Sequence, residues 1–405
     1  MNQKILTGQA VILAAGESSR FWPLNYQNKT LFKIMGKPLI WHTIEGLKKA
    51  GIKEIVIVQG PKKEVEEDLK NYNLDQIRYV IQEKPDGMGN AIMRAQGLVS
   101  GPFFVVGGHK VDAGDYVSGI IKKDKEMVLL GVRTNQPWRY GILKIEGDKI
   151  KDLIEKPEKG KEPSNLKLGA VYLLPPTFFE YHRRVPKDHY SFEQALKFYI
   201  KEEKVGLIEA KEDLSSLKYP WQLFSLVKYL LDKNLGDKKV HIGKNTKIFE
   251  GAIVKGPCYI GDNCVIGNNA LVREYTDLED GTVVGAQSEV TRCLLQEGAH
   301  MHSGFLGDSI LGRNCRVGAG AITGNVRLNK DEISSVIKGE KVMTGQKSLG
   351  IIMGQNTKAG INVSFMPGVL IGSDCVVGPA SVVFENIEDN VTFYTKFEKV
   401  VKKNV

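Results

Sequence analysis

Two cations, Arg20 and Lys29, follow a short apolar run that ends in the small residues Ala14, Ala15 and Gly16. Small side chains let a ligand approach the main chain, and the turn after such a run can direct several backbone N–H groups at an anion. A guanidinium has a planar fork of donors suited to phosphate oxygens, whereas an ammonium is a mobile point charge. This order of residue types indicates phosphate binding and fits phosphoryl transfer.

The whole segment 10–40 resembles the signature of the sugar-1-phosphate nucleotidylyltransferases. The matching residues are Leu13 to Gly16, Arg20, Pro23, Leu24, Lys29 and Lys37 to Ile40. Ser18 and Asn28 differ from the family, which has a glycine and a proline there. The resemblance implies that Leu13, Ala14, Ala15 and Gly16 bind the nucleotide and that Arg20 and Lys29 are catalytic.

Two further segments resemble the binding segments of this family. Gln82 and Gly87 stand where the family reads the nucleobase, but Met88-Gly89 replaces its Thr-Ala, so the choice of base stays open. Four residues stand in the order of the family's sugar-phosphate site: Gly141, Glu155, Lys156 and Asn165. A carboxylate accepts sugar hydroxyl protons, a lysine neutralises the sugar phosphate, and an asparagine both donates and accepts.

The resemblance also implies Mg²⁺ as a cofactor, because the family holds this ion with two aspartates. Gly108 and Ser216 stand at those positions, and the nearest carboxylates in sequence are Asp112 and Asp213. At ~3.3 Å per extended residue, each lies roughly 10 Å or more from the family position unless the chain folds back. His109 is a poor ligand for this ion, which prefers oxygen.

Seven apolar runs alternate with amphipathic stretches in the first 235 residues, which is typical of a doubly wound α/β sheet. The runs predicted as strands are 10–13, 54–58, 77–81, 103–106, 127–132, 141–145 and 169–174. The stretches predicted as helices are 39–50, 63–71, 90–99 and 220–231.

From Ile242 onward, large aliphatic residues recur every six positions as far as Val290, and a small residue follows each of the first eight by four. A period of six fits neither a helix nor a hairpin, but it fits a triangular coil of parallel strands. Cys258 and Cys264 are therefore expected to fill the inner wall. The pattern breaks from about residue 323 to residue 350 and then resumes.

This repeat resembles the left-handed parallel β-helix of hexapeptide-repeat acyltransferases. The segment 300–325 resembles the acetyltransferase half of bifunctional enzymes that make UDP-N-acetylhexosamines. That resemblance implies acetyl-CoA as a co-substrate, His302 as the base that deprotonates an amino sugar, and Asn325 as a site residue. Neutral imidazole near pH 7 suits the role of a base. Phe305, Arg316 and Asp331 depart from the family, which has a tyrosine, often an asparagine, and a lysine there.

The chain of 405 residues is long enough for two domains. We expect a Rossmann-like doubly wound nucleotidyltransferase domain over 1–235, a left-handed β-helix over 236–391 and a basic tail over 392–405. The net charge of +9 is spread along the chain, and none of the five cysteines forms a C-x-x-C pair. These features argue against nucleic acid, zinc and disulfides. No apolar stretch suits a membrane span or a signal peptide, so we expect a cytoplasmic protein.

Two functions remain open. The first is transfer of a nucleotidyl group from a nucleoside triphosphate to a sugar-1-phosphate, which gives a sugar nucleotide and pyrophosphate, with or without acetyl-CoA-dependent N-acetylation in the β-helix. The alternative is a catalytically impaired homologue that binds sugar nucleotide as a regulator or scaffold. The replaced aspartates favour the alternative, and the retained Arg20, Lys29, Glu155 and Lys156 favour the enzyme. Resemblance to other left-handed β-helices implies a homotrimer.

Overall fold

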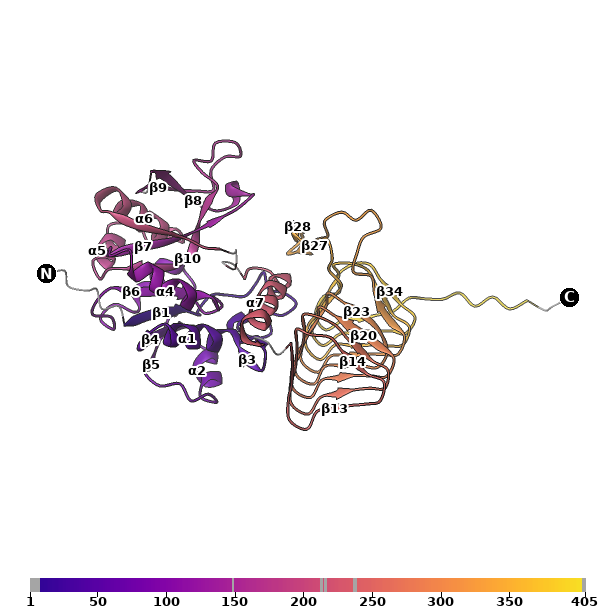
Figure 1. The fold of residues 1–405 in the computed structure, drawn as a ribbon. Coiled ribbons are helices and arrows are strands. Elements are labelled where there is room, and N and C mark those ends of the chain that lie inside the picture. Colours follow the sequence, from indigo (N-terminus) through magenta and orange to yellow (C-terminus); the bar gives the residue numbers. More distant parts are fainter. Residues whose placement is uncertain (1–7, 148, 212–213, 215–216, 236–238, 403–405) are drawn as a thin grey trace. The chain divides into compact units, whose positions relative to one another are not determined.

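The computed structural model describes residues 8–147, 149–211, 214, 217–235 and 239–402 (Figure 1). The chain divides into two compact units. The first consists of Met1–Glu17, Asn28–Phe32 and Lys37–Leu217, and the second of Ser18–Gln27, Lys33–Gly36 and Lys218–Val405. Two short segments on either side of Lys29 therefore group with the C-terminal unit.

The first unit is built on a mixed sheet in the order β11-β7-β10-β6-β1-β4-β5. Its strands are β1 (Gln9–Leu13), β4 (Glu54–Gln59), β5 (Ile77–Ile81), β6 (Phe103–Gly107), β7 (Met127–Arg133), β10 (Leu166–Leu174) and β11 (Val205–Glu209). Strand β10 runs antiparallel to both β6 and β7, and the other neighbours in this order are parallel. The predicted α/β class is confirmed.

Helices cover both faces of this sheet (Figure 1), which explains why its central strands are continuous aliphatic runs. One core cluster joins the sheet to α1 (Leu39–Lys49), α2 (Glu64–Leu69) and α4 (Ala113–Ile121). The other joins it to α3 (Met88–Met93), α5 (Phe178–Arg183) and α6 (Ser191–Glu202). Alternate side chains of β6 enter the two clusters, Phe103 and Val105 on one side and Phe104 and Val106 on the other.

An antiparallel hairpin extends from this sheet. It consists of β8 (Gly141–Glu146) and β9 (Lys149–Glu155), and it joins the sheet where Ile142 pairs with Lys167. The hairpin brings Gly141 opposite Glu155. Neither β9 nor β11 is among the strands predicted from the sequence, because each carries charged residues between its apolar ones or at its end.

The second unit contains η3 (Pro220–Gln222), α7 (Leu223–Leu235) and a parallel β-helix with three sheet faces. One face runs through β12 (Val240–Ile242), β15 (Cys258–Ile260), β18 (Thr276–Leu278), β21 (Leu294–Leu295), β24 (Ile310–Leu311), β29 (Ile352–Met353) and β32 (Leu370–Ile371). The other two faces begin at β13 (Lys247–Ile248) and β14 (Ile253–Val254) and end at β35 (Thr392–Phe393) and β34 (Val382–Val383).

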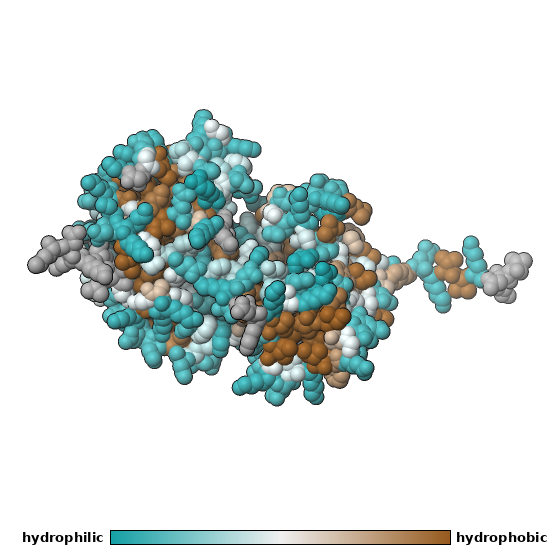
Figure 2. Space-filling view, viewed as in Figure 1, coloured by the Kyte–Doolittle hydropathy of each residue, from teal (hydrophilic) through white to brown (hydrophobic). Residues whose placement is uncertain are grey.

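The six-residue period matches the core of this coil. The large aliphatic residues from Ile260 to Val290 are buried together with the small residues between them, and Cys258 and Cys264 lie in that core as predicted. All five cysteines are free and buried. The first coil is more open, since Ile248 and Ile253 are about half exposed, and apolar side chains gather on the surface of the lower coils (Figure 2).

The predicted interruption is an excursion from the coil. Strand β26 (Ala321–Thr323) pairs directly with β31 (Ser364–Phe365), so the coil continues across the inserted residues. The insertion forms an antiparallel hairpin of β27 (Ser334–Ile337) and β28 (Glu340–Met343). Among the residues described, no helix is both long and apolar enough to cross a membrane.

Candidate functional site

The strand order of the first unit reverses between β1 and β6. From β1 the chain proceeds to β4 and β5 on one side, whereas β6 lies on the other side, with Leu13 opposite Gly107. In open α/β sheets, ligands bind outside the carboxyl ends of the strands at such a switch point. The small residues Ala14, Ala15 and Gly16 follow β1 at this edge, and Gly16 is exposed.

Asn28, which replaces the family's proline, organises this edge. Its Nδ2 donates a 2.7 Å hydrogen bond to the carbonyl of Ala14, and its Oδ1 accepts one of 3.0 Å from the N–H of Thr30. Asn28 thereby caps the short helix η1 (Lys29–Leu31) and ties it to the turn after β1. The substitution supplies a connection that a proline cannot make, since proline has no side-chain donor or acceptor.

Lys29 begins η1 at this same edge. Its side chain is half-buried, and its Nζ donates a 2.8 Å hydrogen bond to the carbonyl of Leu217. The ammonium also acts on His109, which follows β6: burial, then the charges of Lys29 and Lys110, hold the pKa of that imidazole well below its usual value. Arg20 is exposed and belongs to the second unit, whereas Lys29 belongs to the first.

The carboxylate of Asp112 is engaged in an ion pair. Lys110 Nζ lies 2.8 Å from Asp112 Oδ2, both side chains are buried, and the Tyr116 hydroxyl donates to the same oxygen at 3.0 Å. At Gly108, a Cβ atom would lie 2.9 Å from Thr30 Cγ2, so an aspartate does not fit unless Thr30 moves. Asp213 and Ser216 lie outside the described residues. Within the described part of the chain, no three His, Cys, Asp or Glu residues form a metal cluster, so these residues do not fit Mg²⁺.

Gln82 and Gly87 lie together at the end of β5. Gln82 is buried, and its Nε2 donates to Asp86 Oδ1 at 3.0 Å and to the carbonyl of Gly87 at 3.1 Å. Gly87 has a φ of 109°, and a Cβ atom there would lie 3.0 Å from the carbonyl oxygen of His189. The side-chain amide of Gln82 therefore orders this turn, and the turn requires glycine.

The carboxylate of Glu155 lies beneath Gly141 at the end of the β8–β9 hairpin. A Cβ atom at Gly141 would lie 2.8 Å from Glu155 Oε2, so a larger residue there would displace the carboxylate from this position. Lys156 is exposed, and its Nζ lies 5.6 Å from the ring centroid of Tyr190. Asn165 is exposed on the adjoining segment, where its Oδ1 accepts a 3.3 Å hydrogen bond from Arg133, and it does not line the cavity beside Glu155.

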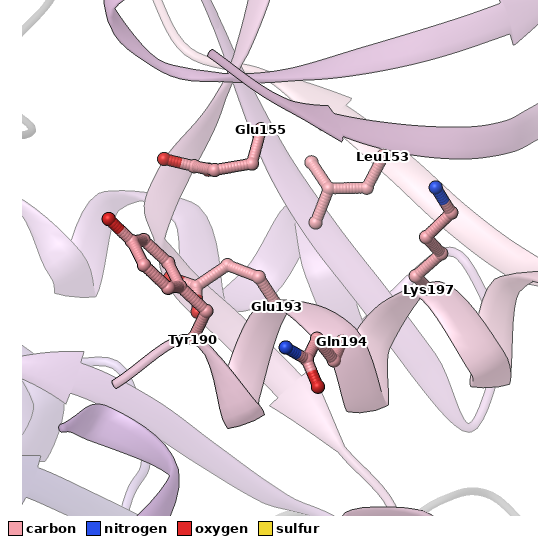
Figure 3. A pocket seen from close by; sticks show the side chains of 6 residues that line it. All are labelled: Leu153, Glu155, Tyr190, Glu193, Gln194 and Lys197. Carbon is pink, nitrogen blue, oxygen red and sulfur yellow. The ribbon is translucent and has the colours of Figure 1, made fainter. Parts of the chain in front are cut away.

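That cavity lies between the hairpin and α6 (Figure 3). Its volume is about 320 Å³, and the residues that line it are Leu153, Glu155, Tyr190, Glu193, Gln194 and Lys197. The four residues from α6 and its start escaped the sequence analysis. Their spacing of three and four positions is the signal that could have found them, since it places polar side chains on one face of a helix.

Two carboxylates give this cavity a negative field. Burial raises the pKa of Glu193, and the charges of Glu155 and Asp188 raise it further, although the backbone hydrogen bond and Lys156 oppose the shift. Glu193 Oε2 is buried without a hydrogen-bond partner among the described residues. Unpartnered carboxylate oxygens suit a ligand rich in hydroxyl donors.

In the β-helix, His302 is exposed just after β22 (His300–Met301), and its ring is nearly parallel to that of His300 at a centroid distance of 6.4 Å.

Asn325 is part of a hydrogen-bond network around Asp308. Its Nδ2 donates to Asp308 Oδ2 at 2.6 Å, and Arg292 binds the same carboxylate with both Nε and Nη2 at 2.6 and 2.9 Å. The Ser348 hydroxyl donates to Asp308 as well.

Comparison with known proteins identifies both parts of the chain. Residues 9–214 match the nucleotidyl transferase family, and residues 239–274 match the bacterial transferase hexapeptide (six repeats) family. A crystal structure of a UDP-glucose pyrophosphorylase complexed with UDP-glucose covers 51% of this chain and 91% of its own, with 24% identity and a TM-score of 0.46.

Two relatives match nearly the whole chain. The bifunctional protein GlmU of Methanocaldococcus jannaschii is 33% identical over 97% of this chain and 99% of its own length. A bifunctional sugar-1-phosphate nucleotidylyltransferase/acetyltransferase of Sulfurisphaera tokodaii is 31% identical over 94% of this chain and 98% of its own. The chain therefore belongs to the family of bifunctional sugar-1-phosphate nucleotidylyltransferase/acetyltransferases.

Proposed function

We propose that the first unit transfers a nucleotidyl group from a nucleoside triphosphate to a sugar-1-phosphate and that the β-helix transfers an acetyl group from acetyl-CoA to an amino-sugar-1-phosphate. The observation that carries the first activity is Lys29 at the β1–β6 edge, where its charge acts on His109. A relative named for both activities, which matches 94% of this chain, supports the pair of functions.

The proposed chemistry of the first unit is an in-line displacement. An oxygen of the sugar-1-phosphate attacks the α-phosphorus of the triphosphate, the bond from that phosphorus to the bridging oxygen breaks, and pyrophosphate leaves. Lys29 and Arg20 neutralise phosphate charge that grows in the transition state, while the N–H groups after β1 bind the phosphates. The half-buried position of Lys29 strengthens its field relative to that of a cation in water.

For the acceptor, we propose the cavity beside Glu155. The carboxylates of Glu155 and Glu193 accept hydrogen bonds from sugar hydroxyl groups, and Lys156 neutralises the phosphate of the sugar. Gly141 leaves the space that Glu155 occupies. We also propose Asn165 as a sugar-binding residue, because the family resemblance implies it. Its Oδ1 accepts a hydrogen bond from Arg133, and this bond is replaced by one to the sugar when the ligand binds.

For the β-helix, we propose His302 as the base that removes a proton from the amino group of the sugar while that nitrogen attacks the thioester carbonyl. The carbon–sulfur bond of the thioester then breaks, and coenzyme A leaves as the thiol after it takes up a proton. The exposure of His302 supports this role, since the imidazole is open to a substrate. Asn325 then acts through Asp308, by keeping in place the coil that follows β23 (Gly304–Gly307).

Magnesium is part of the expectation for the family, but the described residues at the β1–β6 edge do not supply a carboxylate site for it. No step is therefore routed through the ion. A cytoplasmic location is proposed from the sequence. A homotrimer is proposed from the resemblance, and the exposed apolar side chains of Ile248, Phe249 and Ile253 support an association through the β-helix.

The test is pyrophosphate release from a panel of nucleoside triphosphates and sugar-1-phosphates, measured with and without added Mg²⁺, together with acetyl-CoA consumption with an amino-sugar-1-phosphate. Release of pyrophosphate that requires both substrates supports the transferase. Binding of sugar nucleotide without any turnover contradicts it and supports the regulatory alternative, which none of the relatives named above favours.

A further inference from the structure

Within the second unit, two buried carboxylates hold the main chain of a turn that follows Lys29 in sequence. Asp277 Oδ2 accepts a 2.8 Å hydrogen bond from the N–H of Met35, and Glu279 Oε1 accepts one of 3.1 Å from the N–H of Gly36. Asp277 is 0% exposed and Glu279 is 1% exposed. Acids on the outer face of a β-helix are ordinarily solvated, so their burial requires an explanation.

The strand alternation explains why Asp277 points outward. On β18, Leu278 enters the core of the coil, so the neighbouring Asp277 faces away from it. Asp277 lies opposite Tyr259 on β15, and the hydroxyl of Tyr259 lies against Gly36: a Cβ atom there would be 2.6 Å from it. The turn therefore covers the outer face of β15 and β18.

The conformation of the turn suits an anion. Met35 and Gly36 form the two-residue connection between β2 (Lys33–Ile34) and β3 (Lys37–Pro38), with φ values of 55° and 73°. Both lie in the left-handed region, which a methionine seldom adopts. Successive N–H groups of such a turn form a concave anion site, and the carboxylates of Asp277 and Glu279 fill it.

The two carboxyl groups favour a state in which one of them is protonated. Asp277 Oδ1 and Glu279 Oε2 are buried without a hydrogen-bond partner among the described residues. Two neighbouring carboxylates out of reach of water repel each other, and a proton on one of them removes that repulsion. Burial raises the pKa of both acids, and the charge of Asp277 raises that of Glu279 further, whereas the N–H groups of Met35 and Gly36 oppose these shifts.

Other ionisable groups surround the pair. Glu297 repels it but is itself neutralised by Lys33 Nζ at 2.6 Å and Arg313 Nε at 3.3 Å. Tyr259 faces the pair from β15 and also feels the charges of Asp262 and Asp280. This surplus of negative charge favours retention of one proton by the pair at neutral pH.

Further contacts within the second unit fix the other segment of the same loop. Trp22 Nε1 donates to Asp389 Oδ1 at 3.2 Å, and Lys338 Nζ donates to Ser19 Oγ at 3.0 Å. Gln296 Nε2 donates to the carbonyl of Lys33 at 3.0 Å. The two segments of the second unit that flank Lys29 in sequence are thus both bonded to the coils.

We infer that Asp277 and Glu279 are positioning residues for nucleotidyl transfer: they hold the Met35–Gly36 turn in place and thereby restrain a segment that lies close to Lys29 in sequence. The inference rests on the proposed transfer. On this inference, the β-helix contributes to nucleotidyl transfer as well as to acetyl transfer.

The test compares Glu279→Gln, Glu279→Ala and the matched control Glu250→Gln, which changes an exposed glutamate of the first coils. The side-chain amide that Glu279→Gln introduces has the shape of a protonated glutamate and a donor for Asp277, so pyrophosphate release at neutral pH stays at the wild-type level. We expect the wild type to lose activity in alkali as the pair ionises, and we expect that loss to disappear in this variant. Glu279→Ala lowers kcat/KM for pyrophosphate release by about tenfold, whereas acetyl transfer is unchanged.

Hydrogen exchange provides a second readout that does not depend on activity. Corrected for the intrinsic rates, protection of the Met35 and Gly36 amides is expected to fall at alkaline pH in the wild type and in Glu250→Gln, but to persist in Glu279→Gln. An unchanged pH profile in Glu279→Gln, or full nucleotidyl transfer in Glu279→Ala, overturns the inference. If the wild type itself releases no pyrophosphate, the proposed function fails, and the exchange data then show separately whether the carboxylates hold the turn.

Discussion

Lys110 and Asp112 form a buried ion pair at the end of β6, with Nζ 2.8 Å from Oδ2 and the two side chains 0% and 2% exposed. The pair lies after the strand at whose end the family resemblance implies a metal ligand. The positive charge of Lys110 at this edge of the sheet is therefore neutralised by Asp112, which is the one carboxylate among the five residues that follow β6.

The first prediction concerns the stability of this pair. Lys110→Met leaves Asp112 buried and unpaired, so the free energy of unfolding of the first unit is expected to fall by about 3–5 kcal/mol. The double variant Lys110→Met/Asp112→Leu recovers most of that loss. Urea unfolding of the full chain measures both, with Lys70→Met in the exposed pair Lys70–Glu67 as a control that leaves stability unchanged. A double variant no more stable than the single one contradicts the prediction.

The second prediction concerns the electrostatic contact between Lys29 and His109. Burial is the main cause of the lowered pKa of His109, and Lys29 is the next. Lys29→Gln is therefore expected to raise that pKa without restoring its ordinary value. The imidazole proton shifts in an NMR titration report it, and the exposed Lys49→Gln is the control. An unmoved His109 titration means that the ammonium of Lys29 points elsewhere.

The lowered pKa of His109 also predicts a loss of stability in acid. Below about pH 6.5, the ordinary pKa of a histidine, the unfolded chain binds a proton at this residue while the folded chain does not. Stability from this group is present above that pH and is lost as the pH falls toward the folded pKa. His109→Gln is expected to flatten this part of the stability profile. A profile equally steep in the variant counts against it.

A third site prediction concerns substrate recognition at Glu155. Glu155→Gln keeps the shape of the side chain but removes a charged acceptor, so the KM for the sugar-1-phosphate is expected to rise about tenfold. The KM for the nucleoside triphosphate should stay the same, since the cavity beside α6 is proposed for the sugar. Steady-state kinetics with each substrate varied distinguish the two. Glu158→Gln, in the exposed pair with Lys161, serves as the control.

The β-helix offers its own matched comparison, because His300 and His302 lie side by side. Removal of a general base lowers a rate by about 10²–10⁴-fold, so His302→Ala is expected to lose acetyl transfer by that factor. His300→Ala should keep it, since burial and the charge of Arg316 lower the pKa of His300 and the residue is less open to substrate. Equal effects of both substitutions on acetyl-CoA consumption are incompatible with His302 as the base.

The sequence predicted those elements whose signal is local and periodic. The central strands and the coil core follow from runs of aliphatic residues at spacings of one and six, and the cysteines at 258 and 264 fill the wall as expected. Strands β9 and β11 were missed because parts of each are solvated, which breaks up the apolar pattern.

Long-range relationships were not predictable in the same way. Asp277 and Glu279 lie more than 240 positions from the N–H groups that they accept from, and nothing in their neighbourhood indicates burial. Glu193 and Lys197 face Glu155 only because α6 packs beside the hairpin. Asp112 as a metal ligand stays a prediction, and its buried ion pair was not predictable either: Lys110 is two residues away, but the burial of both depends on the surrounding fold.

The central claim is that nucleotidyl transfer takes place beside Lys29 at the end of β1. The most direct measurement is pyrophosphate release by Lys29→Ala, with acetyl transfer by the same preparation as an internal control for folding. We predict that pyrophosphate release is abolished and that acetyl transfer is unchanged. Pyrophosphate release at the wild-type rate in Lys29→Ala would contradict the account.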